Sequence, residues 1–186
     1  HYLTEAEIMD NKDYLNSFIK NDERKILAFI MGGPTKYYEY STKNIRRIFS
    51  ILYSLNKKHD FQLVVIPSMR TPNNTIQYAK EFFGDNHTVI ENIDKKAYLS
   101  ALALSEYIVV TCDSSSMISE AALTGKPVYV ANILPKRNDR RFQNFRNLFR
   151  SMNIIRNLGE PLENLNYQKL DETNRVAKII IERINS

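Results

Sequence analysis

The chain has 186 residues, 43% hydrophobic and 25% charged, which fits one globular domain and excludes a disordered or fibrous protein. Its single cysteine excludes an internal disulfide and agrees with a reducing compartment, so we expect a cytoplasmic protein. The net charge of +5 is concentrated in the basic segment 136–156, and no apolar run is long enough to cross a bilayer.

In chain order, the hydrophobic pattern alternates between helical and extended segments. Residues 3–20 have helical spacing with Thr4 as the cap, and residues 25–31 form an unbroken apolar run, as in strands buried on both faces. A helix capped by Ser41 or Thr42 follows. The pattern then predicts strands at 61–66, 88–90, 107–111 and 128–131, and helices at 73–83, 95–105 and 114–124.

The last part of the chain predicts two more helices, separated by a loop at 159–161. The first carries the inward side chains Phe142, Phe145, Phe149 and Met152, and the closing one carries Val176, Ile180 and Ile184. Strands that alternate with helices of this length are typical of βαβ units. We therefore predict the α/β class, with a doubly wound, Rossmann-like parallel sheet.

In an open parallel sheet, ligands bind outside the carboxyl ends of the strands, so the segments after the strands hold the candidate site. Gly32, Gly33 and Thr35 follow the first strand and indicate either close backbone approach to a phosphate or a plain tight turn. Ser68 and Arg70 follow the second strand. The arginine favours a phosphate fork, and a surface ion pair is the alternative.

Several common sites are excluded. The chain lacks a complete G-x-G-x-x-G with its ribose-binding acid and lacks a Walker A motif, which excludes nicotinamide-dinucleotide and P-loop sites. Cys112 has no histidine near it in sequence, so we expect a buried residue at a strand end and not a nucleophile. The three histidines have no metal-ligand spacing, and we expect neither a metal nor a cofactor.

The most informative stretch is 111–128, T-C-D-S-S-S-M-I-S-E-A-A-L-T-G-K-P-V. Asp113 or Ser114 caps a helix that Gly125 and Pro127 end.

The first turn of that helix leaves backbone N–H groups open to an anion, at Ser114, Ser115, Ser116 and Met117. Glu120 shares a face with Ser116 and lies about 6 Å further along the helix. This spacing favours a nucleoside diphosphate lying along the helix. An ordinary serine-capped helix with a surface glutamate is the alternative.

The sequence resembles the mitochondrial-fission ELM family over nearly its whole length. The residues that carry the resemblance are G-G-P at 32–34, S-M-R-T-P at 68–72, the block 111–128, R-F-Q-N-F at 141–145 and the stretch 166–177. Two positions depart from the family pattern. Related sequences usually carry a second arginine where Met69 stands, and the lack of this arginine would weaken phosphate binding here. They also usually carry N-P-Y where this chain has Lys96-Ala97-Tyr98.

The block 111–128 also resembles the donor half of GT-B glycosyltransferases, particularly the N-acetylglucosaminyltransferase of peptidoglycan lipid intermediates. The resemblance implies that Glu120 binds a ribose, that Ser114 to Met117 take the diphosphate, and that Ile93 reads the base. It implies a single GT-B-type half-domain at 25–186, preceded at 1–24 by a helix and linker from a missing N-terminal domain. We expect binding of a nucleoside diphosphate or nucleotide sugar, no turnover by this chain alone, and no identifiable catalytic residue.

A different function remains open. Eukaryotic members of the ELM family are associated with attracting a dynamin-like fission protein to the mitochondrial outer membrane. In that case the basic segment 136–156 would contact an anionic membrane or a protein partner, and the protein would sit peripherally at a membrane. A solvated helix face is the plainer interpretation of the same charges. Nucleic acid is excluded because no nucleic-acid module surrounds them.

Overall fold

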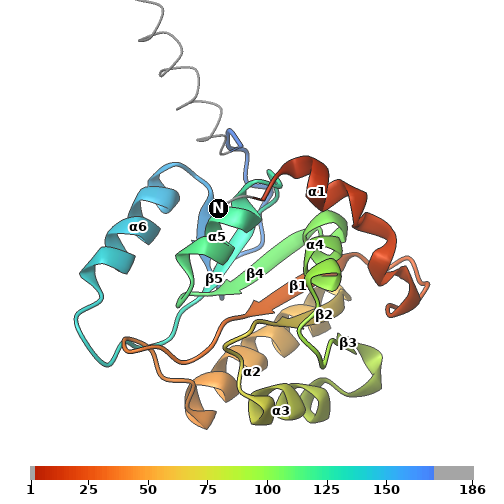
Figure 1. Ribbon diagram of the computed structural model, residues 1–186, viewed down its shortest axis with the longest axis horizontal. Coiled ribbons are helices and arrows are strands. Elements are labelled where there is room, and N and C mark those ends of the chain that lie inside the picture. Colours follow the sequence, from red (N-terminus) through yellow and green to blue (C-terminus); the bar gives the residue numbers. More distant parts are fainter. Residues whose placement is uncertain (1–2, 170–186) are drawn as a thin grey trace, which may run out of the picture.

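Six short strands form one parallel sheet in the computed structural model, which describes residues 3–169 (Figure 1). Their order in the sheet is β3-β2-β1-β4-β5-β6. Because the chain returns from the edge strand β3 to place β4 beside β1, the sheet is wound outward in both directions, which confirms the predicted doubly wound α/β class. The strands are β1 (Ile26–Met31), β2 (Gln62–Pro67), β3 (Thr88–Val89), β4 (Tyr107–Thr111), β5 (Val128–Ala131) and β6 (Ile155–Asn157).

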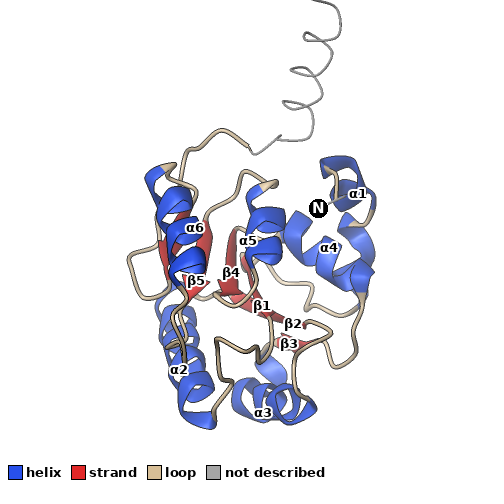
Figure 2. Ribbon diagram, turned by 60° about the vertical axis from the view of Figure 1, so that its left-hand side comes forward, coloured by secondary structure: helices blue, strands red, loops and turns tan. Residues whose placement is uncertain are grey.

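The helices form two layers, one on each face of the sheet (Figure 2). One face carries α2 (Thr42–His59) and α3 (Asn73–Phe83). The other carries α1 (Glu5–Asp10), α4 (Lys95–Leu104), α5 (Ser115–Ala122) and α6 (Arg140–Ser151). Two 3-10 turns, η1 (Lys12–Ser17) and η2 (Gly84–Asn86), connect them to the sheet. Right-handed crossovers that run in opposite directions from the sheet centre produce this division.

The core lies on both faces of the central strands. Every residue of β2 and β5 is buried, as expected for parallel strands covered on both sides. Phe29 of β1 packs edge-on against Phe49 of α2, with ring centroids 6.1 Å apart. On the opposite face, Leu15 of η1 is fully buried and its N–H donates to Ser100 Oγ of α4 at 3.0 Å. The described residues before β1 therefore pack as part of the same body.

The structure differs from the expected elements in three places. The helix expected over 3–20 ends at Asp10, because Asn11 leaves helical geometry (φ −103°, ψ 5°) and a 3-10 turn follows. The sequence pattern does not predict β6, which pairs with β5 but has only one apolar residue. Met152 lies just past the end of α6 and is 44% exposed, so its predicted inward position is wrong. The predicted closing helix lies outside the described residues.

His87 is a half-buried histidine just before β3. Leu63 N–H donates to its Nδ1 at 3.3 Å, so the neutral ring carries its proton on Nε2. Asn56 Nδ2 lies 3.3 Å from that Nε2, while Asn56 Oδ1 is buried without a partner among the described residues; turning the amide over gives the ring proton an acceptor. Burial, and then the charges of Arg24 and Lys20, lower the pKa of His87 below its ordinary value of 6.5.

This histidine makes the stability of the fold depend on pH. Because its pKa is lower in the folded chain than in the unfolded one, the unfolded chain binds the proton first as the pH falls below about 6.5. The free energy of unfolding should therefore decrease from about pH 7.5 to about pH 5.5. The variant His87→Asn keeps an acceptor for Leu63 but does not titrate, so urea denaturation should show a shallower pH dependence. An equal change in the control His59→Asn, at an exposed position of α2, would contradict this role.

Candidate functional site

The carboxyl ends of the parallel strands meet at one edge of the sheet, which we call the rim. The rim consists of the segments that follow β1, β2, β3 and β4, namely residues 32–35, 68–71, 91–94 and 112–117. Helices that follow parallel strands begin at this edge (Figure 1). The fold thus brings together the segments in which the sequence places its candidate binding residues.

Asp113 is the buried centre of the rim. Its side chain is 0% exposed, and its carboxylate accepts hydrogen bonds from Gly33 N–H at 3.1 Å and from Tyr40 OH at 2.7 Å. Arg70 Nη2 forms a salt bridge with the same carboxylate at 2.9 Å. The Tyr40 hydroxyl also lies 2.8 Å from Thr111 Oγ1, at the end of β4. One buried carboxylate therefore ties together the segments after β1, β2 and β4.

Gly32 and Gly33 are required by close packing within the rim. A Cβ on Gly32 would lie 2.2 Å from Asp113 Oδ2, and a Cβ on Gly33 would lie 1.9 Å from the backbone oxygen of Arg70. Their N–H groups and carbonyl oxygens all bond side chains of the neighbouring loops, namely Thr71, Arg70, Thr111 and Asp113. The two glycines thus shape the rim, and their N–H groups are already used within the protein.

Thr35 and Ser68 also serve the local turns. Thr35 Oγ1 accepts from the N–H groups of Tyr37 and Tyr38, each at 3.1 Å. Ser68 Oγ lies 3.4 Å from the N–H of Arg70 and accepts from it. These hydroxyls hold the two loops in shape.

Arg70 combines the two features that the sequence leaves as alternatives. Its guanidinium is paired with Asp113 and donates from Nη1 to Gly33 O at 3.2 Å, yet the side chain is 41% exposed. A guanidinium has five N–H donors, and one of them makes the hydrogen bond to Gly33 O, while the contact with Asp113 is an ion pair. The arginine is therefore fixed in place while most of its donors are not used by the described residues.

The first turn of α5 offers backbone donors beside this pair. Ser114 caps the helix, since its hydroxyl accepts from Met117 N–H at 3.3 Å, whereas Asp113 is turned into the rim. Within residues 3–169, the N–H groups of Ser115 and Ser116 have no acceptor. The helix dipole adds positive potential at this end. These features together suit an anion.

Glu120 lies about one and a half turns into α5 and faces α4. Its Oε2 accepts from Tyr98 OH at 2.6 Å. Burial, and then the charge of Glu120, raise the pKa of Tyr98 well above its ordinary value of 10.0, so the hydroxyl stays protonated and donates. With Lys95 and part of α1, the two side chains line a hollow of about 260 Å³. Ile93, in the rim segment 91–94, is 53% exposed.

Sequence reasoning missed three parts of this arrangement: the inward role of Asp113, its donor Tyr40, and the contact of Tyr98 with Glu120. The N-P-Y comparison at 96–98 is a signal for Tyr98. Asp113 and Tyr40 leave no such signal, because an aspartate before three serines has the pattern of a helix cap.

The basic segment 136–156 is partly used inside the protein. Arg146 Nη2 pairs at 3.1 Å with Asp139, whose side chain is 1% exposed, and Tyr38 OH donates to the same carboxylate at 2.6 Å. Arg150 donates two hydrogen bonds to Glu160, at 2.8 and 3.0 Å. Arg137, Arg140 and Arg141 are exposed. Over residues 3–169, no helix is both long enough and apolar enough to span a membrane.

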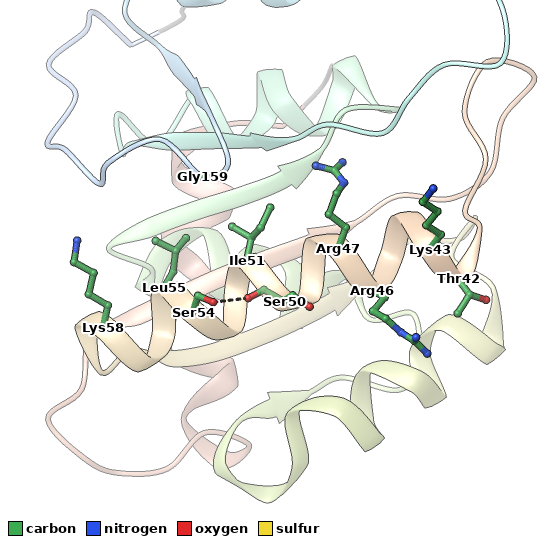
Figure 3. Close-up of a pocket in the computed structure, with 10 residues that line it drawn as sticks. All are labelled: Thr42, Lys43, Arg46, Arg47, Ser50, Ile51, Ser54, Leu55, Lys58 and Gly159. Atoms are coloured by element: carbon green, nitrogen blue, oxygen red, sulfur yellow. Dashed lines mark hydrogen bonds between the residues drawn. The ribbon is translucent and has the colours of Figure 1, made fainter.

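A larger hollow of about 1000 Å³ runs along the outer face of α2, from Thr42 to Lys58 (Figure 3). Ile51 and Leu55 line its middle, and its cations are Lys43, Arg46, Arg47 and Lys58. This hollow lies on the sheet face opposite α5 (Figure 2), so it is separate from the hollow at Glu120 and from the first turn of α5. We base the candidate site on the rim, where polar groups from several loops converge.

Two further kinds of site are a metal site and a reactive thiol, and the described residues favour neither. Among residues 3–169, no group of three or more His, Cys, Asp or Glu side chains is placed to hold a metal ion. Cys112 is buried, and burial raises the pKa of its thiol to about 11, as expected for an unreactive residue at a strand end.

Comparison with known proteins gives a consistent family. The family model described as "Mitochondrial fission ELM1" matches residues 1–184. Protein RP120 of Rickettsia prowazekii is 33% identical over 171 residues, covering 84% of this chain and 46% of that protein. Mitochondrial fission protein ELM1 of Arabidopsis thaliana is 42% identical over 65 residues, covering 34% of this chain and 15% of that protein. The chain thus spans less than half the length of the curated relatives it matches.

Solved structures share the fold. The UDP-GlcNAc 2-epimerase of Methanocaldococcus jannaschii, in complex with UDP-GlcNAc and UDP, matches with a TM-score of 0.53 and 13% identity. The match covers 93% of this chain and 48% of the epimerase chain. The chain therefore has the fold of half of such a protein, as predicted.

The packing of Gly32 gives a stability prediction. In Gly32→Ala the added methyl group would meet a carboxylate that three groups hold in place, so the Asp113 network must break or shift. We expect a loss of about 3 kcal/mol in the free energy of unfolding, measured by urea denaturation. The control Ser50→Ala, at an exposed position of α2, introduces no clash and should change that free energy by no more than about 0.5 kcal/mol. Equal losses would contradict the packing argument.

Proposed function

The chain belongs to the mitochondrial fission ELM1 family, and we propose that its rim binds a nucleoside diphosphate or nucleotide sugar, as the donor-side half of a GT-B-like glycosyltransferase. The observation that carries the proposal is the pair of N–H groups at Ser115 and Ser116, which have no acceptor among the described residues and closely follow Asp113, the partner of the half-exposed Arg70. A diphosphate has the charge and the acceptor oxygens that such a group of donors requires.

Two further residues would contact the ribose and the base of the nucleotide. Glu120 has one oxygen held by Tyr98, and its other oxygen would accept from the ribose hydroxyls. Ile93, exposed on the loop before α4, would lie against the base. The solved neighbours support this assignment only through their fold, with UDP and UDP-GlcNAc bound in the epimerase. We expect no turnover by this chain alone, since it corresponds to about half of its relatives.

The recruiting function has weaker support from the geometry. Two of the arginines that would form its basic surface, Arg146 and Arg150, are paired within the protein. The buried Asp139 accounts for Arg146, and Glu160 accounts for Arg150, without a membrane or a partner. The nucleotide-binding proposal accounts for more of the rim residues.

A single backbone donor can be removed to test the diphosphate site. Ser115 is the first residue of α5, where proline is tolerated, and the extended backbone of Ser114 (φ −125°, ψ 101°) fits the residue before a proline. Ser115→Pro therefore deletes one N–H and keeps the helix. We expect calorimetric titration to show about tenfold weaker UDP binding and unchanged uridine binding, as a lost charge-assisted hydrogen bond implies.

The matched control Ser115→Ala keeps the N–H and should bind UDP like the unmodified chain. If Ser115→Pro binds UDP as tightly as the unmodified chain, the assigned anion site is wrong. If the unmodified chain does not bind UDP, the proposed function is wrong.

The ribose assignment predicts a different pattern. Glu120→Gln keeps an acceptor for Tyr98 but removes the charge, so it should weaken UDP and uridine alike, by about tenfold. The control is Glu106→Gln, a partly exposed acid just before β4 at the amino ends of the strands, which should change neither affinity. A loss confined to UDP would place Glu120 near the phosphates and contradict the ribose role.

A further inference from the structure

We propose that Asp113 is a positioning residue that holds the Arg70 guanidinium in the orientation required to bind the diphosphate. This inference rests on the proposed function and names a residue that would act on the ligand only through Arg70.

The first step is the burial of the carboxylate. The Asp113 side chain is 0% exposed, so its charge must be compensated by groups of the protein. Two hydrogen bonds and one ion pair do so: Gly33 N–H and Tyr40 OH donate to the carboxylate, and Arg70 Nη2 forms a salt bridge with it. Burial, and then the charge of Asp113, raise the pKa of Tyr40 well above its ordinary value of 10.0, so this hydroxyl remains a donor.

The second step is what this does to Arg70. An arginine side chain on a surface loop samples many rotamers, and ordering it lowers the affinity for a ligand. Here Nη2 is held by Asp113 at 2.9 Å and Nη1 by Gly33 O at 3.2 Å, which fixes the plane of the guanidinium. Its other donors are not used by the described residues, and the side chain is 41% exposed. The other residues of the loop 68–72, including Met69, carry no charge, so Arg70 is the only cation there. The orientation of Arg70 therefore decides which anion the loop can bind.

The third step is position. Asp113 immediately precedes Ser114, the cap of α5, so the carboxylate that holds Arg70 also lies beside the donors of Ser115 and Ser116. An oxyanion at the start of α5 would thus meet both sets of donors. The carboxylate itself faces the protein interior and is shielded from the anion by its own donors.

The test separates positioning from a structural role. Asp113→Asn keeps one oxygen for Gly33 N–H, and its amide nitrogen can donate to the Tyr40 oxygen while that hydroxyl turns to Thr111 Oγ1, but it has no charge with which to orient Arg70. UDP and uridine are titrated calorimetrically against the unmodified chain, Asp113→Asn, Arg70→Met and the double variant. We expect Asp113→Asn to weaken UDP binding about tenfold and leave uridine binding unchanged, and to have no further effect in the Arg70→Met background. A pure folding defect would weaken both ligands.

An unchanged UDP affinity in Asp113→Asn, equal losses for UDP and uridine, or an undiminished effect in the absence of Arg70 would overturn the inference. If Asp113→Asn does not fold, the unmodified chain decides, through the NMR order parameter of the Arg70 Nε–H bond in the absence of ligand. A guanidinium ordered before binding supports positioning, and one as mobile as the exposed Arg137 overturns it. Absence of UDP binding by the unmodified chain would instead refute the proposed function, and this inference with it.

Discussion

A carboxylate that is removed from water must receive hydrogen-bond donors from the protein, and the rim of this sheet is arranged around that requirement at Asp113. The loop after β1 comes close enough to donate only because Gly32 and Gly33 have no side chains in the way. The loop after β2 contributes Arg70, and Tyr40 closes the third side. The shape of the candidate site is therefore a consequence of satisfying one buried charge, and the exposed binding groups lie around it.

The two buried aspartates of the structure show that position decides the role of an arginine. Asp139 holds Arg146 at 16% side-chain exposure, and that pair fixes the start of α6 against Tyr38. Asp113 holds Arg70 at 41% side-chain exposure, at an edge where the N–H groups of α5 are also directed. Arg146 makes its contacts within the protein. Arg70 retains donors for a ligand, although the local chemistry of the two pairs is alike.

The sequence predicts most of the fold because parallel strands are apolar on both faces. The runs at β1, β4 and β5 are recognisable without any tertiary information, whereas β6 is not, since Arg156 and Asn157 give it the look of a loop and its pairing with β5 decides its structure. The cap at Ser114 is likewise a local feature. The network of Asp113 joins residues that are 37 to 80 positions apart, and no local pattern indicates it.

Stability alone does not explain why the rim contains an ion pair. A salt bridge whose carboxylate is buried often contributes no more than well-packed apolar side chains would, because the cost of removing the carboxylate from water offsets the attraction. A scaffold that served only as a docking platform would be at least as stable with an apolar rim, in the manner of the uninterrupted core beneath it. The pair becomes understandable if Arg70 must be held ready for an anion, since an arginine fixed before binding loses less conformational freedom on binding. The same reasoning applies to Glu120: its contact with Tyr98 holds one oxygen, and in the proposed function the other oxygen would accept from the ligand.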